Sequence, residues 1–130
     1  MGKWLVVDGV EYKVPIIEMK RKGDILDKTA NRTEDGDLHR EVIGTYYNFS
    51  LKMRSGSKPA DLEMYNNLFW VLTEPVAYHE VQLPGQSEAA KMYFGSIQDQ
   101  IKYIDDDETT YYKDLSCNVI CKLPSRYANG

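Results

Sequence analysis

Residues 47–54 alternate without exception between apolar and polar side chains, and this stretch constrains the fold more than any other. The odd positions from Tyr47 to Met53 are apolar, and the even positions from Asn48 to Arg54 are polar. Successive side chains of a β-strand point to opposite faces, so a period of two predicts a strand with one buried and one solvent-facing side. Such strands are typical of antiparallel sheets.

A β-hairpin is predicted near the start of the chain. Residues 4–7 and 10–14 are rich in valine and flank the dipeptide Asp8-Gly9, which suits a two-residue type I′ turn. Pro15 is expected to end or bend the second strand, because proline has no N–H to donate to a neighbouring strand.

One helix is predicted between two prolines. Pro59 suits the first turn, Asp61 complements the positive end of the helix dipole, and Pro75 stops the element. The apolar side chains between them recur at helical spacing and form a stripe that would pack on a sheet. These are Leu62, Tyr65, Phe69 and Leu72, with Leu68 alongside.

The remaining strands and turns complete the predicted fold. Strands are expected near residues 16–21, 77–83, 90–97, 100–105 and 111–123, with turns at Pro84-Gly85-Gln86 and at residues 105–108. The fold class is therefore mainly β with one α-helix. We expect an antiparallel β-sandwich or open barrel with the helix packed on one face, in a single domain spanning residues 1–130.

A long polar loop is predicted at residues 27–39, because this segment carries few periodic apolar positions. A loop of this length is unusual inside a compact domain, and such loops tend to be functional or to depend on a partner. The segment and its border supply the candidate contact residues: Lys28, Arg32, Thr33, Glu34, Asp35, Asp37 and Arg40.

The net charge of −4 disfavours nucleic acid as the main partner, because phosphate binding needs a basic field. The basic cluster Lys20-Arg21-Lys22 and the acidic run at residues 105–108 are both interpreted as solvated charges at loops or strand ends.

No catalytic, cofactor-binding or metal-binding residues are predicted, so the chain is not expected to be an enzyme or to need a cofactor. His39 and His79 are the two histidines, and neither belongs to a metal-ligand pair. His79 is interpreted as a satisfied strand histidine. Residues 31–36 resemble the first half of an EF-hand calcium loop, but Val42 stands where the loop requires a bidentate glutamate.

Cys117 and Cys121 would share one face of a strand, roughly 13 Å apart. A disulfide needs Cα atoms within about 7 Å, so these two cysteines are not expected to bridge each other. They are interpreted as small buried hydrophobic residues.

No membrane association is expected, because no apolar run approaches the roughly 20 residues that span a bilayer. Asp8 and Gly9 interrupt the first apolar run, so a signal peptide is not indicated. The expectation is a protein made and kept in a cytosol.

Residues 32–49 resemble a segment of small tail-module proteins from phages and prophages of Gram-positive bacteria. Met19-Lys20-Arg21, Ile25-Leu26-Asp27 and Glu74-Pro75-Val76 fit the same pattern, so the resemblance spans most of the chain. It implies a structural subunit of the virion tail, with a β-sandwich and a helix, that assembles with copies of itself into a ring, commonly a hexamer. A tail tube, a distal-tail or baseplate ring and a tail-completion protein all stay open.

The resemblance also implies partners and a role for the polar loop. Other tail proteins would be neighbours, DNA would pass through the ring without specific binding, and the loop at residues 27–39 would reach a neighbouring subunit. An acidic chain suits a DNA conduit, whose wall should repel DNA. The simpler alternative is a mobile surface loop with no partner.

A second hypothesis is a carbohydrate- or ligand-binding β-sandwich module at a tail tip. Exposed aromatic rings can stack on sugars, and the candidate rings are Tyr46, Tyr78, Tyr111 and Tyr112. Their other interpretation is as interface or half-buried strand tyrosines.

Overall fold

The computed structural model describes residues 3–34 and 36–128, and within them the chain is mainly β with one helix, as predicted. The elements in chain order are β1 (Leu5–Val7), β2 (Val10–Tyr12), β3 (Ile16–Arg32), β4 (Leu38–Arg54), α1 (Pro59–Leu72), β5 (His79–Gln82), β6 (Ala90–Gln98), β7 (Ile101–Ile104), β8 (Thr110–Tyr112), β9 (Asp114–Cys121) and β10 (Arg126–Tyr127).

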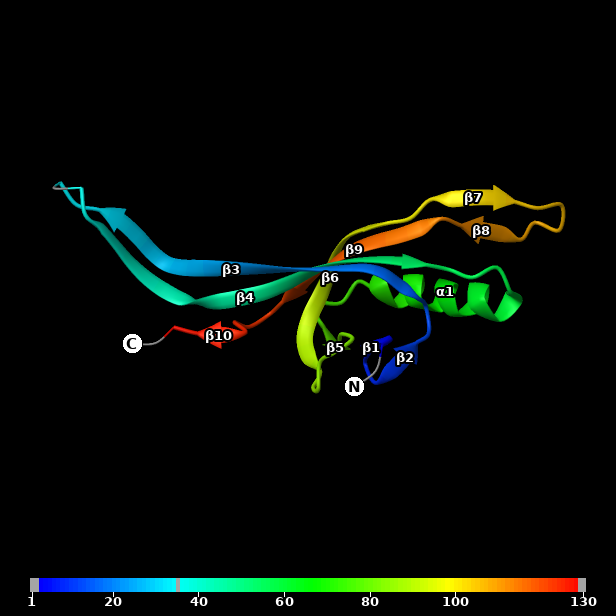
Figure 1. Cartoon of the computed structure of the whole chain (residues 1–130), viewed down its shortest axis with the longest axis horizontal. Coiled ribbons are helices and arrows are strands. Elements are labelled where there is room, and N and C mark those ends of the chain that lie inside the picture. Colours follow the sequence, from blue (N-terminus) through cyan, green and yellow to red (C-terminus); the bar gives the residue numbers. More distant parts are fainter. Residues whose placement is uncertain (1–2, 35, 129–130) are drawn as a thin grey trace.

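Eight strands form one antiparallel sheet that is not closed into a barrel (Figure 1). β3 pairs with one side of β4, and the other side of β4 pairs with β9 and, further along, with β10. The sheet then continues through β6, β5 and β1 to β2. β7 and β8 pair with each other as a separate two-stranded sheet.

The predicted hairpin and its turn are confirmed. Asp8 and Gly9 both have positive φ, at 52° and 82°, which is the backbone geometry that a type I′ turn requires. β1 pairs with β2 in register, and β1 also pairs with β5. The hairpin therefore forms one edge of the sheet.

The predicted alternation along β4 is also confirmed. Phe49, Leu51 and Met53 are buried on one face of the sheet. On the opposite face, the Ser50 hydroxyl donates to Asn118 Oδ1 at 3.0 Å, and Arg54 Nε donates to Asp114 Oδ1 at 2.8 Å. One face of the sheet is thus apolar and the other is polar, because the side-chain period of a strand is two.

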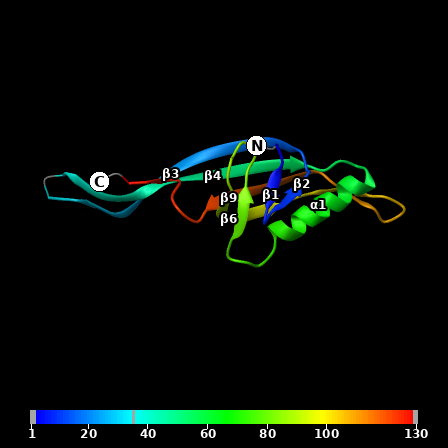
Figure 2. The same ribbon diagram turned by 90° about the horizontal axis from the view of Figure 1, so that it is seen from below.

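α1 covers part of the apolar face, as Figure 2 shows. Its buried side chains are Leu62, Tyr65, Leu68 and Leu72, while Phe69 of the predicted stripe is half-buried beside them. Pro59 occupies the first turn, and the Asp61 carboxylate accepts a hydrogen bond from the Lys58 N–H at 3.4 Å. The helix therefore begins as its sequence signals predict.

Both cysteines are free, as expected. Cys117 is buried in the core, and this burial raises the pKa of its thiol to about 12. The Cys121 thiol donates to the Tyr47 carbonyl oxygen at 2.9 Å. The interpretation of Cys117 as a small buried hydrophobic residue is therefore confirmed.

The prediction of a long loop at residues 27–39 is wrong. β3 continues to Arg32 and β4 begins at Leu38, so most of the segment is a paired two-stranded ribbon, and among the described residues only 33, 34, 36 and 37 lie between the two strands. The described side chains of this ribbon are exposed or half-buried, so the apolar alternation that identifies a half-buried strand is not needed here. The side-chain pattern therefore did not predict the pairing of these two strands.

A second correction concerns the last predicted strand, at residues 111–123. The chain breaks it at Lys113, whose N–H bonds to the Gln100 carbonyl, and β8 and β9 on either side belong to different sheets. A change of pairing partner leaves no mark in a local pattern, which explains why one strand was expected.

Candidate functional site

The most distinctive feature is an arm, residues 27–42, in which β3 and β4 pair with each other beyond the rest of the sheet (Figure 1). β10 pairs alongside at Gly44 and Thr45, and Ile43 accepts a further bond from the Ala128 N–H. Gly44 permits this close approach, because a Cβ there would collide with the Arg126 carbonyl oxygen. The arm begins where this support ends.

Polar contacts within the arm use most of the predicted contact residues. Arg40 Nη2 donates to Asp27 Oδ1 at 2.7 Å, and Lys28 lies 4.0 Å from Glu41. At the tip, Arg32 Nη1 donates to the Gly36 carbonyl at 2.9 Å. Exposed ion pairs of this kind contribute at most about 1 kcal/mol each, so they shape the ribbon more than they stabilise it.

The remaining predicted contact residues lie at or near the tip. Thr33 Oγ1 donates to the Asp37 carbonyl at 3.4 Å across the turn, and Glu34 is exposed. Asp35 lies outside the described residues. The structure thus brings the candidate residues together along one ribbon, and their described partners are on the same chain.

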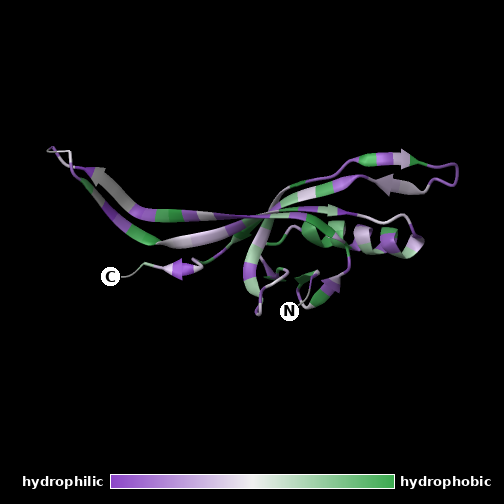
Figure 3. Ribbon diagram, viewed as in Figure 1, coloured by the Kyte–Doolittle hydropathy of each residue, from purple (hydrophilic) through white to green (hydrophobic). Residues whose placement is uncertain are grey.

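Exposed apolar side chains on the arm and at its base are a feature that sequence reasoning missed. The exposed ones are Ile25, Leu26, Leu38, Val42 and Ile43. Figure 3 shows hydrophobic segments interrupting the hydrophilic ribbon. A two-stranded ribbon is at best marginally stable in water, and exposed apolar patches mark interaction sites. The adjacent pairs Ile25-Leu26 and Val42-Ile43, set in polar sequence, could have signalled this surface.

A second projection is the β7–β8 hairpin, which extends beyond the end of α1 on the side of the molecule away from the arm (Figure 1). All four residues of β7 are exposed, including Ile101, Tyr103 and Ile104. Trp70, on the outer face of α1, is 78% exposed. Both ends of the molecule therefore carry apolar surface that its own fold does not cover.

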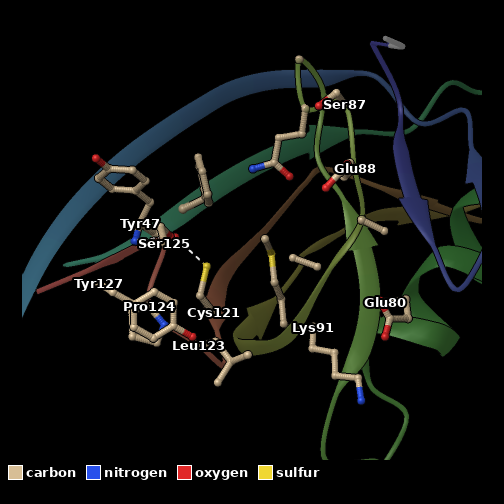
Figure 4. A pocket seen from close by; sticks show the side chains of 16 residues that line it. Tyr47, Glu80, Ser87, Glu88, Lys91, Cys121, Leu123, Pro124, Ser125 and Tyr127 are labelled. Carbon is tan, nitrogen blue, oxygen red and sulfur yellow. Dashed lines mark hydrogen bonds between the residues drawn. The ribbon is translucent and has the colours of Figure 1, made fainter. Parts of the chain in front are cut away.

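The apolar face of the sheet also contains an open groove of about 810 Å³ (Figure 4). Tyr47 and Phe49 of β4, Met92 of β6 and Cys121 of β9 line its floor, and the β5–β6 loop and the segment after β9 form its sides. α1 does not line this half of the face.

The closest approach to a catalytic arrangement is His79, at the start of β5, beside Asp8. The buried His79 Nδ1 lies 2.7 Å from Asp8 Oδ2, and Asp8 Oδ1 accepts the Glu80 N–H at 2.9 Å. Among the residues that the structure describes, no serine, threonine or cysteine lines the pocket around this pair. The geometry ties the first turn to β5, and the interpretation of His79 as a satisfied strand histidine is confirmed.

Replacing Asp8 should remove the hydrogen bonds that join the first turn to β5, and the resulting loss of folding stability should depend on pH. The hydrogen bond with His79 lowers the pKa of Asp8 below 3.8. A carboxyl group with a lowered folded-state pKa stabilises the fold above pH 3.8, and this contribution is lost as the pH falls through the folded pKa. Asp8→Ala is therefore expected to cost about 1–3 kcal/mol at neutral pH, from lost hydrogen bonds and a strained positive φ.

Urea unfolding measured from about pH 7 down to about pH 3 would test this expectation. The difference in free energy of unfolding between Asp8→Ala and the unaltered protein should become smaller as the pH falls. Asp8→Asn is the control, because asparagine tolerates the left-handed turn and keeps an acceptor oxygen. If this difference in free energy of unfolding were the same at every pH, the ionised Asp8 carboxylate would not be the group that stabilises the fold.

The candidate sugar-stacking tyrosines do not form one site. Tyr111 stacks on Tyr103 with ring centroids 4.6 Å apart, and Tyr112 stacks on Tyr65 at 4.7 Å. Tyr78 contacts the edge of Tyr93 beside β5, and Tyr46 is half-buried on β4. Three of the four rings thus have aromatic partners on their own chain. Tyr111 and Tyr112 share β8, whereas Tyr46 lies on β4 and Tyr78 precedes β5.

Two further searches cover the described parts of the chain. No group of three or more histidine, cysteine or acidic side chains there could hold a metal ion. No helix in residues 3–34 or 36–128 is long and apolar enough to cross a bilayer. Comparison with protein-family models and with curated proteins finds no match to this chain.

Proposed function

We propose that this chain is a structural subunit of a phage or prophage tail that assembles with copies of itself into a ring around the DNA path. The observation that carries the proposal is the arm. A paired ribbon that leaves the body and bears exposed Leu38 and Val42 contributes little to its own chain's core, so its natural role is to contact another subunit.

The two projections support a repeating assembly. The arm and the β7–β8 hairpin leave the body toward different ends of the molecule (Figure 1), so one copy can contact two neighbours at once. Surfaces that differ at the two ends make head-to-tail contacts, and such contacts form a ring when the rotation closes. The resemblance of residues 32–49 to tail-module proteins favours a ring of this kind in the virion.

The charge distribution supports a conduit for DNA rather than a DNA-binding site. The chain carries 20 acidic against 16 basic side chains. On the polar face of the sheet, Lys20 and Lys22 of β3 each lie within 4.0 Å of an acidic neighbour on the same strand, Glu18 and Asp24. A surface with balanced charge on an acidic protein offers no strong attraction for phosphates.

The solution mass over a concentration series, measured by light scattering coupled to size exclusion, tests the proposal. We expect a defined ring or growth into tubes as the concentration rises, together with no binding of duplex DNA at physiological salt. A protein that stays monomeric at every concentration would contradict self-assembly. Titration with host cell-wall polysaccharide would then test the ligand-binding alternative.

A further inference from the structure

The long strand β3 has a partner strand on only one of its two edges. One edge pairs with β4, and within the described part of the chain no strand pairs with the other edge. The pairing with β4 is regular from Glu18 to Leu26, with register shifts before and after this stretch. In its middle, Arg21, Gly23 and Ile25 are all exposed. A regular, exposed strand edge of this length is a template for pairing with another chain.

The contacts of β4 show which backbone groups β3 presents at its free edge. The Tyr47 N–H donates to Ser125 Oγ at 3.1 Å, and the Thr45 carbonyl oxygen accepts the Ser125 N–H at 2.8 Å. Ser125 immediately precedes β10, which lies on the side of β4 away from β3. Tyr47 therefore exchanges no backbone hydrogen bonds with Gly23, its partner on β3. The N–H and C=O groups of Gly23 point to the free edge, and those of every second residue along the strand point the same way.

The charges along β3 favour one register for an antiparallel pair of two such edges. With Gly23 opposite Gly23 of a second copy, Lys22 of each copy is opposite Asp24 of the other, and no like charges oppose each other within the regular stretch. Moving the centre by one residue places Lys22 opposite Lys22 or Asp24 opposite Asp24. Moving it by two places Lys22 opposite Lys20 or Lys28. Like charges directly opposite each other are destabilising, so the register centred on Gly23 is preferred.

The side chains on both faces of β3 fit this register. On the polar face, Lys22 Nζ lies 3.7 Å from Asp24 Oδ1 of its own strand, so two copies would bring four charges of alternating sign together. On the other face, Met19 and Ile25 are 40% and 58% exposed, and each would lie diagonally across from the other residue on the second copy. Gly23 has no side chain, so the two strands can approach closely at the centre of the pair.

We propose that two copies of this chain pair through β3, antiparallel about a two-fold axis at Gly23, so that one sheet continues across both copies. Gly23 would pair with Gly23, and Arg21 of each copy with Ile25 of the other, each pair exchanging two backbone hydrogen bonds. The contact goes beyond the proposed function and does not rest on it, because it uses neither the arm nor the β7–β8 hairpin. A two-fold contact uses the same surface on both copies, so it is complete in a dimer.

A cysteine at the centre of the free edge tests the pairing. In a hydrogen-bonded antiparallel pair the two Cα atoms are about 5.5 Å apart, which a disulfide can span. Gly23→Cys should therefore form a covalent dimer on mild oxidation, seen by denaturing electrophoresis without reductant. A Cβ at this position would meet the Tyr47 ring at 3.7 Å, an ordinary van der Waals distance, so the variant should fold, and circular dichroism checks this.

Arg21→Cys and Ile25→Cys are the matched controls for the register. In the proposed pair, residue 21 is opposite residue 25, and two copies of either variant hold their new cysteines roughly 13 Å apart along the strand. Neither variant should form a covalent dimer alone, whereas an equimolar mixture of the two should. The unaltered protein, with its buried Cys117 and half-buried Cys121, gives the background.

The charges opposite each other provide a second measurement. Lys22→Asp in the Gly23→Cys protein places like charges opposite each other at two positions, so it should lower the yield of covalent dimer at least about fivefold. Adding Asp24→Lys exchanges the two charges and should restore the yield.

A Gly23→Cys protein that yields no dimer above the background would overturn the pairing, and so would Arg21→Cys alone linking as readily as the mixture. If a ring forms without the Gly23→Cys link, the pairing is overturned while the proposed function stands. If the Gly23→Cys link forms as expected but no ring or tube grows, the pairing stands and the proposed function is overturned.

Discussion

Shortening the arm is expected to abolish assembly while leaving the body folded. Asp27 and Val42 are opposite each other in the ribbon, so residues 28–41 can be replaced by an Asn-Gly turn that joins the two strands directly. The buried hydrophobic core draws no residue from this stretch among the described side chains. The replacement removes two exposed ion pairs, Arg40–Asp27 and Lys28–Glu41, each worth at most about 1 kcal/mol, so the loss of folding stability should stay below about 2 kcal/mol.

Light scattering reports the mass of the shortened protein, and thermal unfolding reports its stability. We expect neither a ring nor a tube at concentrations where the unaltered protein forms one. Arg40→Gln is the control, because it removes the ion pair with Asp27 but keeps the length and apolar side chains of the arm, and it should still assemble. Normal assembly of the shortened protein would show that the arm does not join subunits.

Truncating Leu51 is expected to produce the largest loss of stability. Leu51 is fully enclosed at the centre of the sheet, between Met19 of β3 and Cys117 of β9. Leu51→Ala removes apolar contacts and leaves a cavity, and substitutions of this kind cost about 2–5 kcal/mol. Because single domains are stable by only about 5–15 kcal/mol, the variant should be close to the limit of folding at 37 °C.

Urea unfolding provides the measurement, with Ser50→Ala as a control on the same strand. Ser50 is on the polar face. Ser50→Ala removes one hydrogen bond to Asn118, so it should lower the free energy of unfolding by about 0.5–1.5 kcal/mol. A midpoint shift for Leu51→Ala no larger than that for Ser50→Ala would mean that α1 and the sheet repack around the missing side chain.

Elements with a buried face could be predicted from local sequence. The alternation of residues 47–54, the Asp8-Gly9 turn and the apolar stripe from Leu62 to Leu72 each follow from a period or a turn geometry that a few neighbouring residues define. Burial of one side of a strand or helix requires apolar side chains to recur with the period of that element. The recurrence of apolar side chains in the sequence therefore indicates which side is buried.

The arm and the groove could not be predicted from local sequence. In the arm, the described side chains are exposed or half-buried, so strand pairing imposes no apolar alternation, and a loop was predicted at residues 27–39. The groove joins Tyr47 of β4, Met92 of β6 and Tyr127 of β10, which are brought together only by the sheet order. Apart from tight turns such as Asp8-Gly9, local pattern holds no information on which strands become neighbours.

By itself, the sequence determined the first hairpin, the alternating part of β4, and where the helix begins and ends. Those properties depend on interactions within a few residues of the chain. The tertiary structure alone decided that β3 and β4 continue as a free arm, that β8 and β9 belong to different sheets, and that α1 covers only part of the apolar face. These features depend on which distant segments pair, because backbone hydrogen bonds between strands can form with little regard to the side chains that the strands carry.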